Sequence, residues 1–369
     1  MTRHGCRYPR SELQIGCVKE LFRGPPMNLT MKGEREMEEL GSVLRLRYQH
    51  LLSREEGIIL HCSPLQRSVA SSLALLRGLS PESRALFIAS GGARSCSLVS
   101  PQLSHGLVPL TIEGDEDVLF HGGLNLRELK EYQLQQVKKL SNELQEYMNL
   151  EELMCKLYRT TSIPSLSPAT PLEDRVKVLK SLHNLVVTAE NEEHEICGGG
   201  LLLSDEERLT LATAASLITR SKYPRNHQGM KFATFSCSHL RHQLYHLALN
   251  GEFHSPSFVH YSAHESTIIS LTTALSLHPS TCRCGGTGGT ESERNCTPEL
   301  GDAPYYGALV LMEVYLPLKQ VDGSEMPLIS LKYYIHPSLM NNEVISPTIP
   351  FHMLPSREGS ERVLHALSL

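Results

Sequence analysis

The sequence contains no run of about 18 consecutive apolar residues, the minimum that a membrane-spanning helix needs. It also has no excess of positive charge, because 40 acidic residues outweigh 35 lysines and arginines and leave a formal net charge of −5. Proteins that bind nucleic acids favour a basic face. We therefore predict no membrane span in this chain and no nucleic acid among its partners.

The sequence likewise lacks the usual spacings of a metal or nucleotide site. Its cysteines do not have the close spacing of a zinc ribbon, and the glycine-rich run Gly285–Gly289 lacks the G-K-[ST] ending of a P-loop. His239, His242 and His246 share one face of an expected helix. Such histidines more often pack or face solvent than bind zinc. We therefore predict neither a metal ion nor another cofactor.

The sequence does contain a histidine between two arginines, in the run Arg3–Pro9 that reads R-H-G-C-R-Y-P. A phosphate monoester carries nearly two negative charges, so its hydrolysis needs fixed cations and an aligned nucleophile. Arg3 and Arg7 can supply the cations, since guanidinium groups bind phosphate oxygens in pairs and stay charged. His4 can attack phosphorus as neutral imidazole and carry the phosphoryl group.

Two further candidate groups follow apolar, strand-like segments. Phe258–Ala263 leads to His264 and Glu265, and Ile58–Cys62 leads to Arg67 at the start of a small-residue helix. An alkoxide leaves poorly, so a carboxylic acid such as Glu265 is needed to protonate it and then to take a proton from water. His264 can donate a hydrogen bond to phosphate. Arg67 would point beyond the carboxyl end of its strand, where α/β sheets bind ligands.

Each of these motifs also has an ordinary structural interpretation. Arg3 and Arg7 could belong to a solvated N-terminal arm, and Arg67 could be a surface residue in a first helical turn. His264 and Glu265 could simply begin a helix, where an acidic residue is favourable. The occurrence of all three motifs in this order favours the catalytic interpretation.

In this combination the chain resembles the histidine acid phosphatases, the second branch of the histidine phosphatase superfamily. Their signature R-H-G-x-R-x-P is matched within Arg3–Pro9, and Y-S-A-H-D-T-T is matched at Tyr261–His264. Their R-S-T-D-x-x-R-T signature is matched loosely, by Arg67 and Ser68. Weaker likenesses, such as that of Pro304–Ala308 to P-Y-A-S, extend the resemblance over nearly the whole chain.

The resemblance implies a phosphomonoester hydrolase of the acid phosphatase type, with a phosphohistidine intermediate on His4 and with Glu265 as general acid and base. The implied phosphate-binding residues are Arg3, Arg7, Arg67 and His264. No cofactor is implied. The implied fold is α/β, with a three-layer core like that of the phosphoglycerate mutases, a mixed, mostly parallel sheet flanked by helices, and an inserted helical cap. The resemblance also allows a homodimer.

Besides the loosely matched second signature, the chain departs from the family pattern in two places. Glu265 stands where the family has aspartate, as happens near this place in multiple inositol polyphosphate phosphatases, so the carboxyl group must start further back. The family also has a buried strand before R-H-G, whereas only Met1 and Thr2 precede Arg3. We therefore expect the first core strand to be missing and stability to suffer, because neighbouring strands would lose backbone partners.

Hydrophobic periodicity divides the chain into an α/β core, residues 1–115 and 251–369, and a helical cap inserted at residues 116–250. The expected helices are Thr30–Leu52, Gln66–Gly78, Asn125–Asn149, Leu172–Ala189, Ser204–Arg220, His239–Leu249 and Ser266–Leu275. The expected strands are Ile58–Cys62, Phe258–Ala263, Ala308–Leu316 and Leu328–Ile335. Thr161–Pro171 is a connector rich in Ser, Pro and Thr, and the polar segment Pro355–Leu369 is expected to fray.

The sequence does not identify the alcohol that the phosphate esterifies. Phosphorylated sugars or glycans, lysophosphatidate, inositol phosphates and phosphotyrosine occur as substrates in the resembled branch, and we rank simple monoesters first because the cap has no basic cluster. The alternative is a catalytically weak or inactive phosphate-binding pseudophosphatase, which the loose second signature and Glu265 support. A mutase of the first branch is less favoured, because that branch prefers R-H-G-E.

The resemblance predicts that the full-length protein belongs to the secretory pathway, in the lysosome, the Golgi or outside the cell. We expect no signal peptide in this chain, because the catalytic motif begins at Arg3. In that pathway Asn28–Thr30 and Asn295–Thr297 would be glycosylation sequons. Cys282 and Cys284, in a loop rich in Gly and Thr, are compatible with either a disulfide bond or a metal clip.

Overall fold

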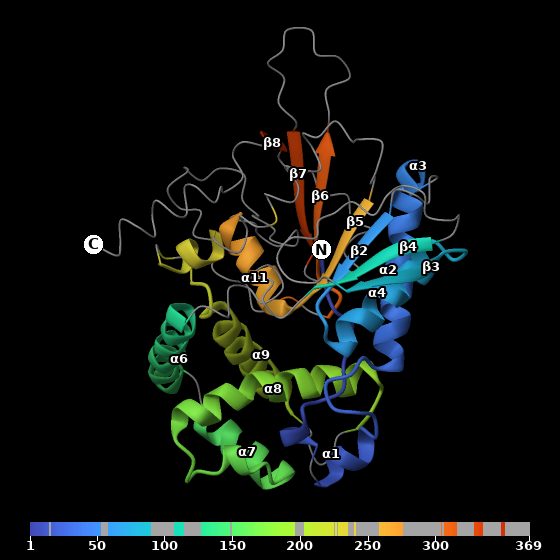
Figure 1. Cartoon of the computed structure of the whole chain (residues 1–369). Coiled ribbons are helices and arrows are strands. Elements are labelled where there is room, and N and C mark those ends of the chain that lie inside the picture. Colours follow the sequence, from blue (N-terminus) through green and yellow to red (C-terminus); the bar gives the residue numbers. More distant parts are fainter. Residues whose placement is uncertain are drawn as a thin grey trace, which may run out of the picture.

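The computed structural model describes residues 1–14, 16–52, 58–89, 107–113, 127–147, 150–195, 203–224, 226, 228–234, 240, 258–275, 304, 306–315, 328–334 and 348–350. Within these residues the chain forms an eight-stranded mixed sheet and a layer of helices beside one edge of it (Figure 1). The expected glycine-rich loop, the cysteine loop, the second sequon and the polar C-terminal segment lie outside the described residues, as does the expected helix at His239–Leu249 apart from Leu240.

The strands of the sheet come from both ends of the chain. They are β1 (Thr2–Arg3), β2 (Ile58–Cys62), β3 (Arg84–Ala89), β4 (Leu107–Ile112), β5 (Phe258–Ala263), β6 (Leu309–Tyr315), β7 (Leu328–Tyr334) and β8 (Thr348–Pro350). Their order in the sheet is β3-β4-β2-β5-β1-β6-β7-β8. The first five pair in parallel and the last three add antiparallel pairs, so the mixed, mostly parallel sheet is confirmed.

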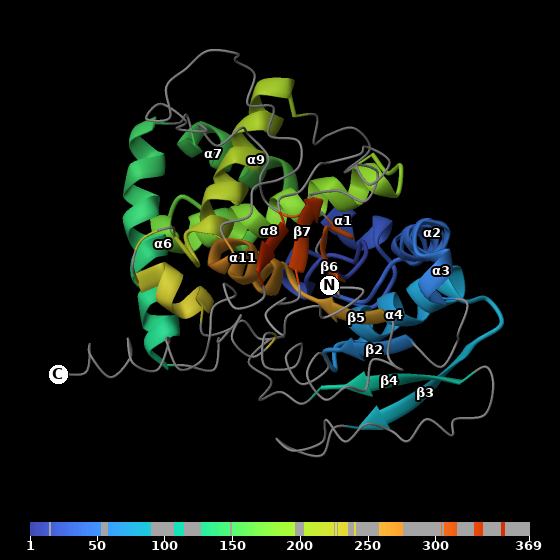
Figure 2. The ribbon, with the colours of Figure 1, turned by 90° about the horizontal axis from the view of Figure 1, so that it is seen from above.

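Alternating side chains of the strands fill two different hydrophobic cores. In β6, Leu309 and Leu311 belong to the core under α2 (Met31–Arg47) and α4 (Gln66–Leu79). Val310, between them, belongs to the core under α11 (Glu265–Ala274). Because successive side chains of a strand point to opposite faces, helices cover both faces of the sheet and give the expected three layers (Figure 2).

A third hydrophobic core lies wholly among helices. It joins α7 (Leu150–Thr161), α8 (Leu172–Asn191), α9 (Asp205–Arg220) and the segment around α1 (Gly16–Leu21), next to α6 (Arg127–Tyr147). These helices lie together beyond the lower edge of the sheet in Figure 1. The short elements are η1 (Ser11–Leu13), α3 (Gln49–Leu52) and η3 (Pro164–Leu166). The division into core and cap at residues 116 and 250 stays a prediction.

Side-chain hydrogen bonds cap the beginning of two helices. The Thr30 hydroxyl caps α2 by accepting a hydrogen bond from the Gly33 N–H, and Ser204 and Glu207 form a capping box at the start of α9. Thr30 is buried and also donates to the Cys6 carbonyl oxygen. The threonine of the first sequon therefore has a structural role that does not depend on glycosylation.

The first strand, which the sequence analysis expected to be missing, is present as the two residues of β1 between β5 and β6. The Met1 ammonium group donates to the Val310 carbonyl oxygen, and the Arg3 N–H donates to the Ala308 carbonyl oxygen, at 2.9 and 2.8 Å. The expectation was wrong because this short backbone segment still finds partners on both sides.

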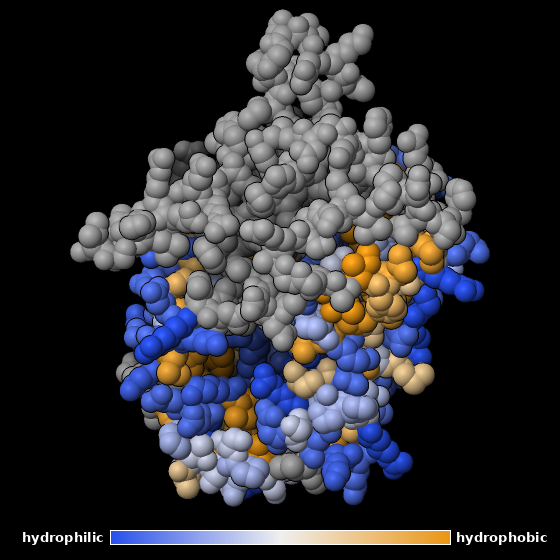
Figure 3. All heavy atoms as spheres, in the orientation of Figure 1, coloured by the Kyte–Doolittle hydropathy of each residue, from blue (hydrophilic) through white to orange (hydrophobic). Residues whose placement is uncertain are grey.

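No helix among the described residues is long and apolar enough to cross a bilayer. On the face shown in Figure 3, hydrophobic side chains are interspersed with hydrophilic ones. Cys6, Cys62 and Cys155 are free thiols, and the first two are buried. The disulfide bond that the sequence allowed at Cys282 and Cys284 lies outside the described residues.

The close packing of α2 against α4 supports a stability prediction. A methyl group on Gly78 would meet the Glu38 carbonyl oxygen at 1.9 Å, well inside contact distance. We expect Gly78→Ala to lower the free energy of unfolding by about 1–3 kcal/mol despite the better helix propensity of alanine, because overpacked helices must separate. Urea unfolding measures this. Glu39→Ala, at an exposed position of α2, is the control and should change stability little.

Candidate active site

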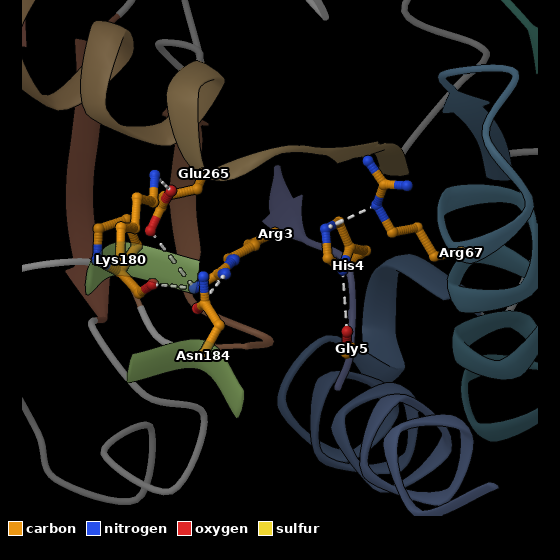
Figure 4. Close-up of polar contacts among 8 residues, drawn as sticks. Arg3, His4, Gly5, Arg67, Lys180, Asn184 and Glu265 are labelled. Carbon is orange, nitrogen blue, oxygen red and sulfur yellow. Dashed lines mark hydrogen bonds and ion pairs between the residues drawn. The ribbon is translucent and has the colours of Figure 1, made fainter. Parts of the chain in front are cut away.

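Three neighbouring parallel strands, β2, β5 and β1, end at the same edge of the sheet. His61 pairs with Tyr261, and Arg3 pairs with Ala263, so the strand ends are aligned. The candidate residues Arg3, His4, Arg67, His264 and Glu265 sit at or directly after these ends, at the position where α/β sheets bind ligands. The structure therefore brings together residues that are distant in the sequence (Figure 4).

His4 is buried, and its two ring nitrogens have different partners. Nδ1 lies 2.9 Å from the Gly5 carbonyl oxygen, and Nε2 accepts a hydrogen bond of 3.0 Å from the Arg67 Nε–H. A nitrogen that accepts must carry a lone pair, so the hydrogen of the neutral ring lies on Nδ1. Burial, followed by the charges of Arg67 and Arg3, holds the pKa of His4 well below its usual value. The ring is therefore neutral, with the Nε2 lone pair directed at a cation.

The backbone beside His4 is fixed by close packing. A Cβ atom on Gly5 would lie 2.5 Å from the Gly33 carbonyl oxygen, so only glycine fits between the loop and α2. The Gly5 N–H donates to the Ser71 hydroxyl at 3.0 Å. The space beside Gly5 is occupied by α2. Gly5 therefore positions the carbonyl group that His4 contacts.

Arg7 and Arg67 surround His4 with positive charge. Arg7 Nη1 donates to the Tyr8 carbonyl oxygen at 3.1 Å and contacts Met27 Sδ. None of the described carboxylates forms an ion pair with Arg7 or Arg67. Burial and then the charges of Arg7 and Arg3 lower the pKa of Arg67 to about 10. These guanidinium groups repel one another, so an anion between them would be stabilised.

The His264 ring packs edge-on against the His4 ring, with ring centroids 5.6 Å apart. Its Nε2 atom is 2.9 Å from the Ser63 hydroxyl, and Ser63 in turn donates to the Ser68 hydroxyl. Since the Ser63 hydrogen is used for Ser68, the hydrogen between Ser63 and His264 belongs to Nε2. His264 thus directs an N–H group toward the strand end. To donate it to a phosphate instead, the ring must leave Ser63.

Arg3 directly precedes His4, the candidate nucleophile, and its side chain contacts Glu265, the candidate acid. Its guanidinium group stacks on the Tyr306 ring, with Cζ 4.3 Å from the ring centroid, and donates to the Pro304 carbonyl oxygen. It also lies 3.8 Å from a carboxylate oxygen of Glu265 and 3.4 Å from the Asn184 side-chain oxygen on α8. Stacking and ion pairing together hold the guanidinium plane in one orientation.

Glu265 forms its shortest ion pair with Lys180 of α8, a residue of the helical layer. Burial alone would raise the pKa of the Glu265 carboxyl, but Lys180, Arg3 and Lys222 outweigh it and lower the pKa to about 2. Burial lowers the pKa of Lys180 to about 7, against the opposing charge of Glu265. Between these pH values both groups are charged. The carboxyl group therefore does not carry the proton that a general acid needs.

A small hollow of about 30 Å³ lies between these residues and the helical layer. Its charged and polar lining is Arg3, Lys180, His183, Asn184, Ser216, Thr219, Glu265 and Tyr306. A water molecule needs roughly 10–15 Å³ on this measure, so the hollow has room for only about two. Among the described residues no group of three potential metal ligands occurs, and this part of the chain offers cations instead.

The sequence analysis did not identify Lys180, Asn184, Tyr306 or Ser63 as site residues. Lys180 and Asn184 lie one turn apart on α8, among buried leucines and valines of the same helix. Polar side chains at spacing i, i+4 on an otherwise apolar helix face were the available signal. Tyr306 lies in a segment that resembled P-Y-A-S, but nothing in the sequence pointed to its contact with Arg3.

No family model and no curated protein sequence matches the chain. Solved structures do match. The phytase of Citrobacter braakii has a TM-score of 0.58 at 12% identity, with 95% of this chain and 89% of the phytase covered. The phytase of Klebsiella sp. ASR1 has a TM-score of 0.56 at 14% identity, with 94% of this chain and 86% of the phytase covered. The fold is that of the histidine acid phosphatases.

The histidine acid phosphatase fold is also shared by a third similar structure. The multiple inositol polyphosphate phosphatase of Bifidobacterium longum, in complex with inositol hexasulfate, has a TM-score of 0.58 at 12% identity, with 91% of this chain and 85% of that chain covered. These likenesses extend over nearly the full length of each protein, so the helical layer is included with the sheet.

The repulsion among the arginines predicts a phosphate effect. Inorganic phosphate should stabilise the wild-type protein, by about 2.7 kcal/mol at 100 times its Kd. Arg67→Met should abolish most of this stabilisation, while leaving the protein without phosphate equally stable or more stable, because the repulsion is relieved. Thermal unfolding with and without phosphate measures both effects.

Arg77→Met is the matched control for this measurement. Arg77 lies on the same helix as Arg67 but pairs with Glu34 and Glu38 at the surface. Phosphate should stabilise the Arg77→Met protein by as much as it stabilises the wild type. An Arg67→Met protein that phosphate stabilises as strongly as the wild type would contradict the assignment of Arg67 to the phosphate site.

Proposed function

We propose that the protein is a phosphomonoester hydrolase that works through a phosphohistidine on His4. The observation that carries the proposal is the neutral His4 ring, whose Nε2 lone pair faces Arg67 at 3.0 Å. A phosphate bound by Arg3, Arg7 and Arg67 would bring its phosphorus atom to this lone pair. The likeness to phytases supports the same class of reaction. His264 would add a hydrogen bond to phosphate, and the proposed chemistry needs no cofactor.

The proposed reaction has two steps. His4 Nε2 attacks phosphorus and the alcohol leaves, with Glu265 directing a proton to the leaving oxygen. Water then attacks the phosphohistidine, and Glu265 accepts its proton. Glu265 lies at the amino end of α11, directly after His264, so the acid and the nucleophile are held on neighbouring strand ends. The ion pair with Lys180 means that the proton has to reach Glu265 from another group.

A pseudophosphatase that binds phosphate without turnover is the second candidate. The specific observation in its favour is the ion pair between Glu265 and Lys180, which keeps the carboxyl group deprotonated. Both candidates bind phosphate through the same arginines. Only the hydrolase uses the His4 lone pair, so a variant of His4 separates them.

His4→Ala is expected to lower kcat/KM for an aryl phosphate by about 10⁴–10⁶-fold, as removal of a covalent nucleophile does. Alkaline quenching during turnover should trap the phosphoryl group on His4 of the wild-type protein, as measured by mass spectrometry. His50→Ala, at an exposed histidine remote from the sheet edge, is the control. Equal rates for wild type and His4→Ala would favour the pseudophosphatase.

We propose that the substrate is a compact monoester, such as a phosphorylated sugar or glycan, and not a polyphosphate. Among the described residues that line the hollow, the helical layer contributes one lysine, Lys180. The other residues that it contributes are His183, Asn184, Val187, Ala212, Ala215, Ser216 and Thr219. A ligand with many phosphate groups would need several cations on this side, because each buried anion requires its own partner.

This proposal predicts a substrate preference. The kcat/KM for a sugar monophosphate should be at least about 10-fold higher than that for inositol hexakisphosphate. Each phosphate group of the hexakisphosphate that lacks a cationic partner forgoes at least one charge-assisted hydrogen bond. Phosphate release from a panel of monoesters and inositol phosphates measures this, at acidic and at neutral pH. Equal or higher efficiency on inositol hexakisphosphate would contradict it.

Two further expectations stay proposals. The location in the secretory pathway derives from the family resemblance, and the assembly as a homodimer derives from the same source.

A further inference from the structure

Lys180 connects the helical layer to the acid of the core. Its ammonium group donates to Glu265 Oε2, and the two side chains are 17% and 13% exposed. One turn later on α8, Asn184 accepts a hydrogen bond from Arg3, which itself lies beside Glu265. Figure 4 shows Lys180 and Asn184 approaching Glu265 and Arg3 from the same side. The helix thus holds both charged groups on the side where a leaving alcohol would bind.

The surroundings of this ion pair restrict its contact with water, because the two side chains are only 17% and 13% exposed. The hollow beside Lys180 and Glu265 is small, about 30 Å³, and is partly open to solvent. Arg3 cannot give up its proton near neutral pH. The other titratable groups that face the pair are His183 on α8, Lys222 after α9 and Tyr333 on β7.

Among these groups, Lys180 is the one whose proton is hydrogen-bonded directly to Glu265. Burial lowers the pKa of His183 to about 4, so it is neutral, and burial raises that of Tyr333 above the working range. The pKa of Lys180, lowered by burial to about 7, is close to the operating pH that general acid catalysis favours. Glu265 is ionised at the same pH.

We propose that Lys180 is a positioning residue that holds Glu265 toward the leaving group and supplies the proton that Glu265 delivers. The proposal rests on the hydrolase function and adds the source of its proton. It follows from the direct contact between the lysine and the carboxylate, from the low exposure of both side chains, and from Asn184, one turn further on α8, which accepts from Arg3 beside the same carboxylate.

The atoms and protons of the two steps balance. In the first step His4 Nε2 forms a bond to phosphorus, the ester P–O bond breaks toward the leaving oxygen, and a proton passes from Lys180 through Glu265 to that oxygen. Lys180 is then a neutral amine. In the second step water attacks phosphorus, the N–P bond breaks toward Nε2, and the proton of the water passes through Glu265 back to Lys180. One water is consumed, and one alcohol and one phosphate are formed.

This pathway predicts the direction in which kcat changes with pH. Activity on a poor leaving group requires protonated Lys180, so kcat should fall as pH rises through about 7. Without the lysine, Glu265 must carry its own proton. Its pKa then rises, because burial is less opposed, while Arg3 and Lys222 still favour the charged form. The fall in kcat should therefore move to lower pH in Lys180→Met.

The experiment compares an alkyl phosphate, which has a poor leaving group, with nitrophenyl phosphate, which leaves without protonation. At pH 7, Lys180→Met should lose about 100-fold or more in kcat on the alkyl phosphate and much less on nitrophenyl phosphate. Lys180→Arg keeps the charge and the ion pair but holds its proton. It should show the same selective loss. Glu265→Gln combined with Lys180→Met should be no worse than Glu265→Gln alone, since the two act as a unit.

Lys177 provides the matched control on the same helix. It is 43% exposed and pairs with Asp174. Lys177→Met and Lys177→Arg should keep the wild-type pH profile and the wild-type ratio between the two substrates. If thermal unfolding shows that Lys180→Met does not fold, Lys180→Arg carries the test.

A wild-type pH profile and substrate ratio in Lys180→Arg would overturn the proposal. The hydrolase function is tested separately: it is supported if the wild-type protein is active and His4→Ala is inactive, whatever the result for Lys180→Arg. If the wild-type protein has no activity, NMR titration of ¹³C-labelled lysines still tests the proton source. One lysine signal should titrate near pH 7 and be missing in Lys180→Arg. Titration of Lys180 at an ordinary lysine pKa would overturn the inference.

Discussion

Arg3, Arg7 and Arg67 hold three guanidinium charges close to a buried, neutral His4, and only Arg3 has a described carboxylate partner. Burial and then the charges of Arg7 and Arg3 lower the pKa of Arg67, and burial together with the arginine charges keeps a second proton off His4. Three neighbouring positive charges destabilise the empty site, and they stabilise an anion that binds among them. The same repulsion that disfavours the empty site therefore prepares both the phosphate pocket and the nucleophile.

Backbone hydrogen bonds and hydrophobic packing hold these charged groups in place despite their repulsion. β1 lies between β5 and β6, and the His4 N–H donates to the Ala263 carbonyl oxygen at 3.0 Å. Two apolar cores, one on each face of the sheet, hold the strand ends in register. The helical layer has its own core and brings Lys180 and Asn184 against the site. Each charged group thus comes from an element that is fixed elsewhere by hydrophobic packing.

Strong sequence patterns predicted their elements well. Ile58–Cys62 and Phe258–Ala263 form strands with the expected bounds, and Ser204 begins its helix through a capping box. Weaker patterns were missed. β4 contains Pro109, and a proline within a short run argues against a strand. Leu150, Leu153, Met154 and Leu157 have the spacing of a helix, and our sequence analysis did not include it.

By itself the sequence determined the chemistry that is available: a histidine among arginines near the start, an arginine after one strand and a His-Glu pair after another. It also indicated that these groups would meet, because parallel strands share one carboxyl edge. Only the tertiary structure decided the protonation states. The ion pair of Lys180 with Glu265 and the hydrogen bond from Arg67 to His4 join residues that are far apart in the chain. Burial and neighbouring charge set a pKa, and neither can be read from local sequence.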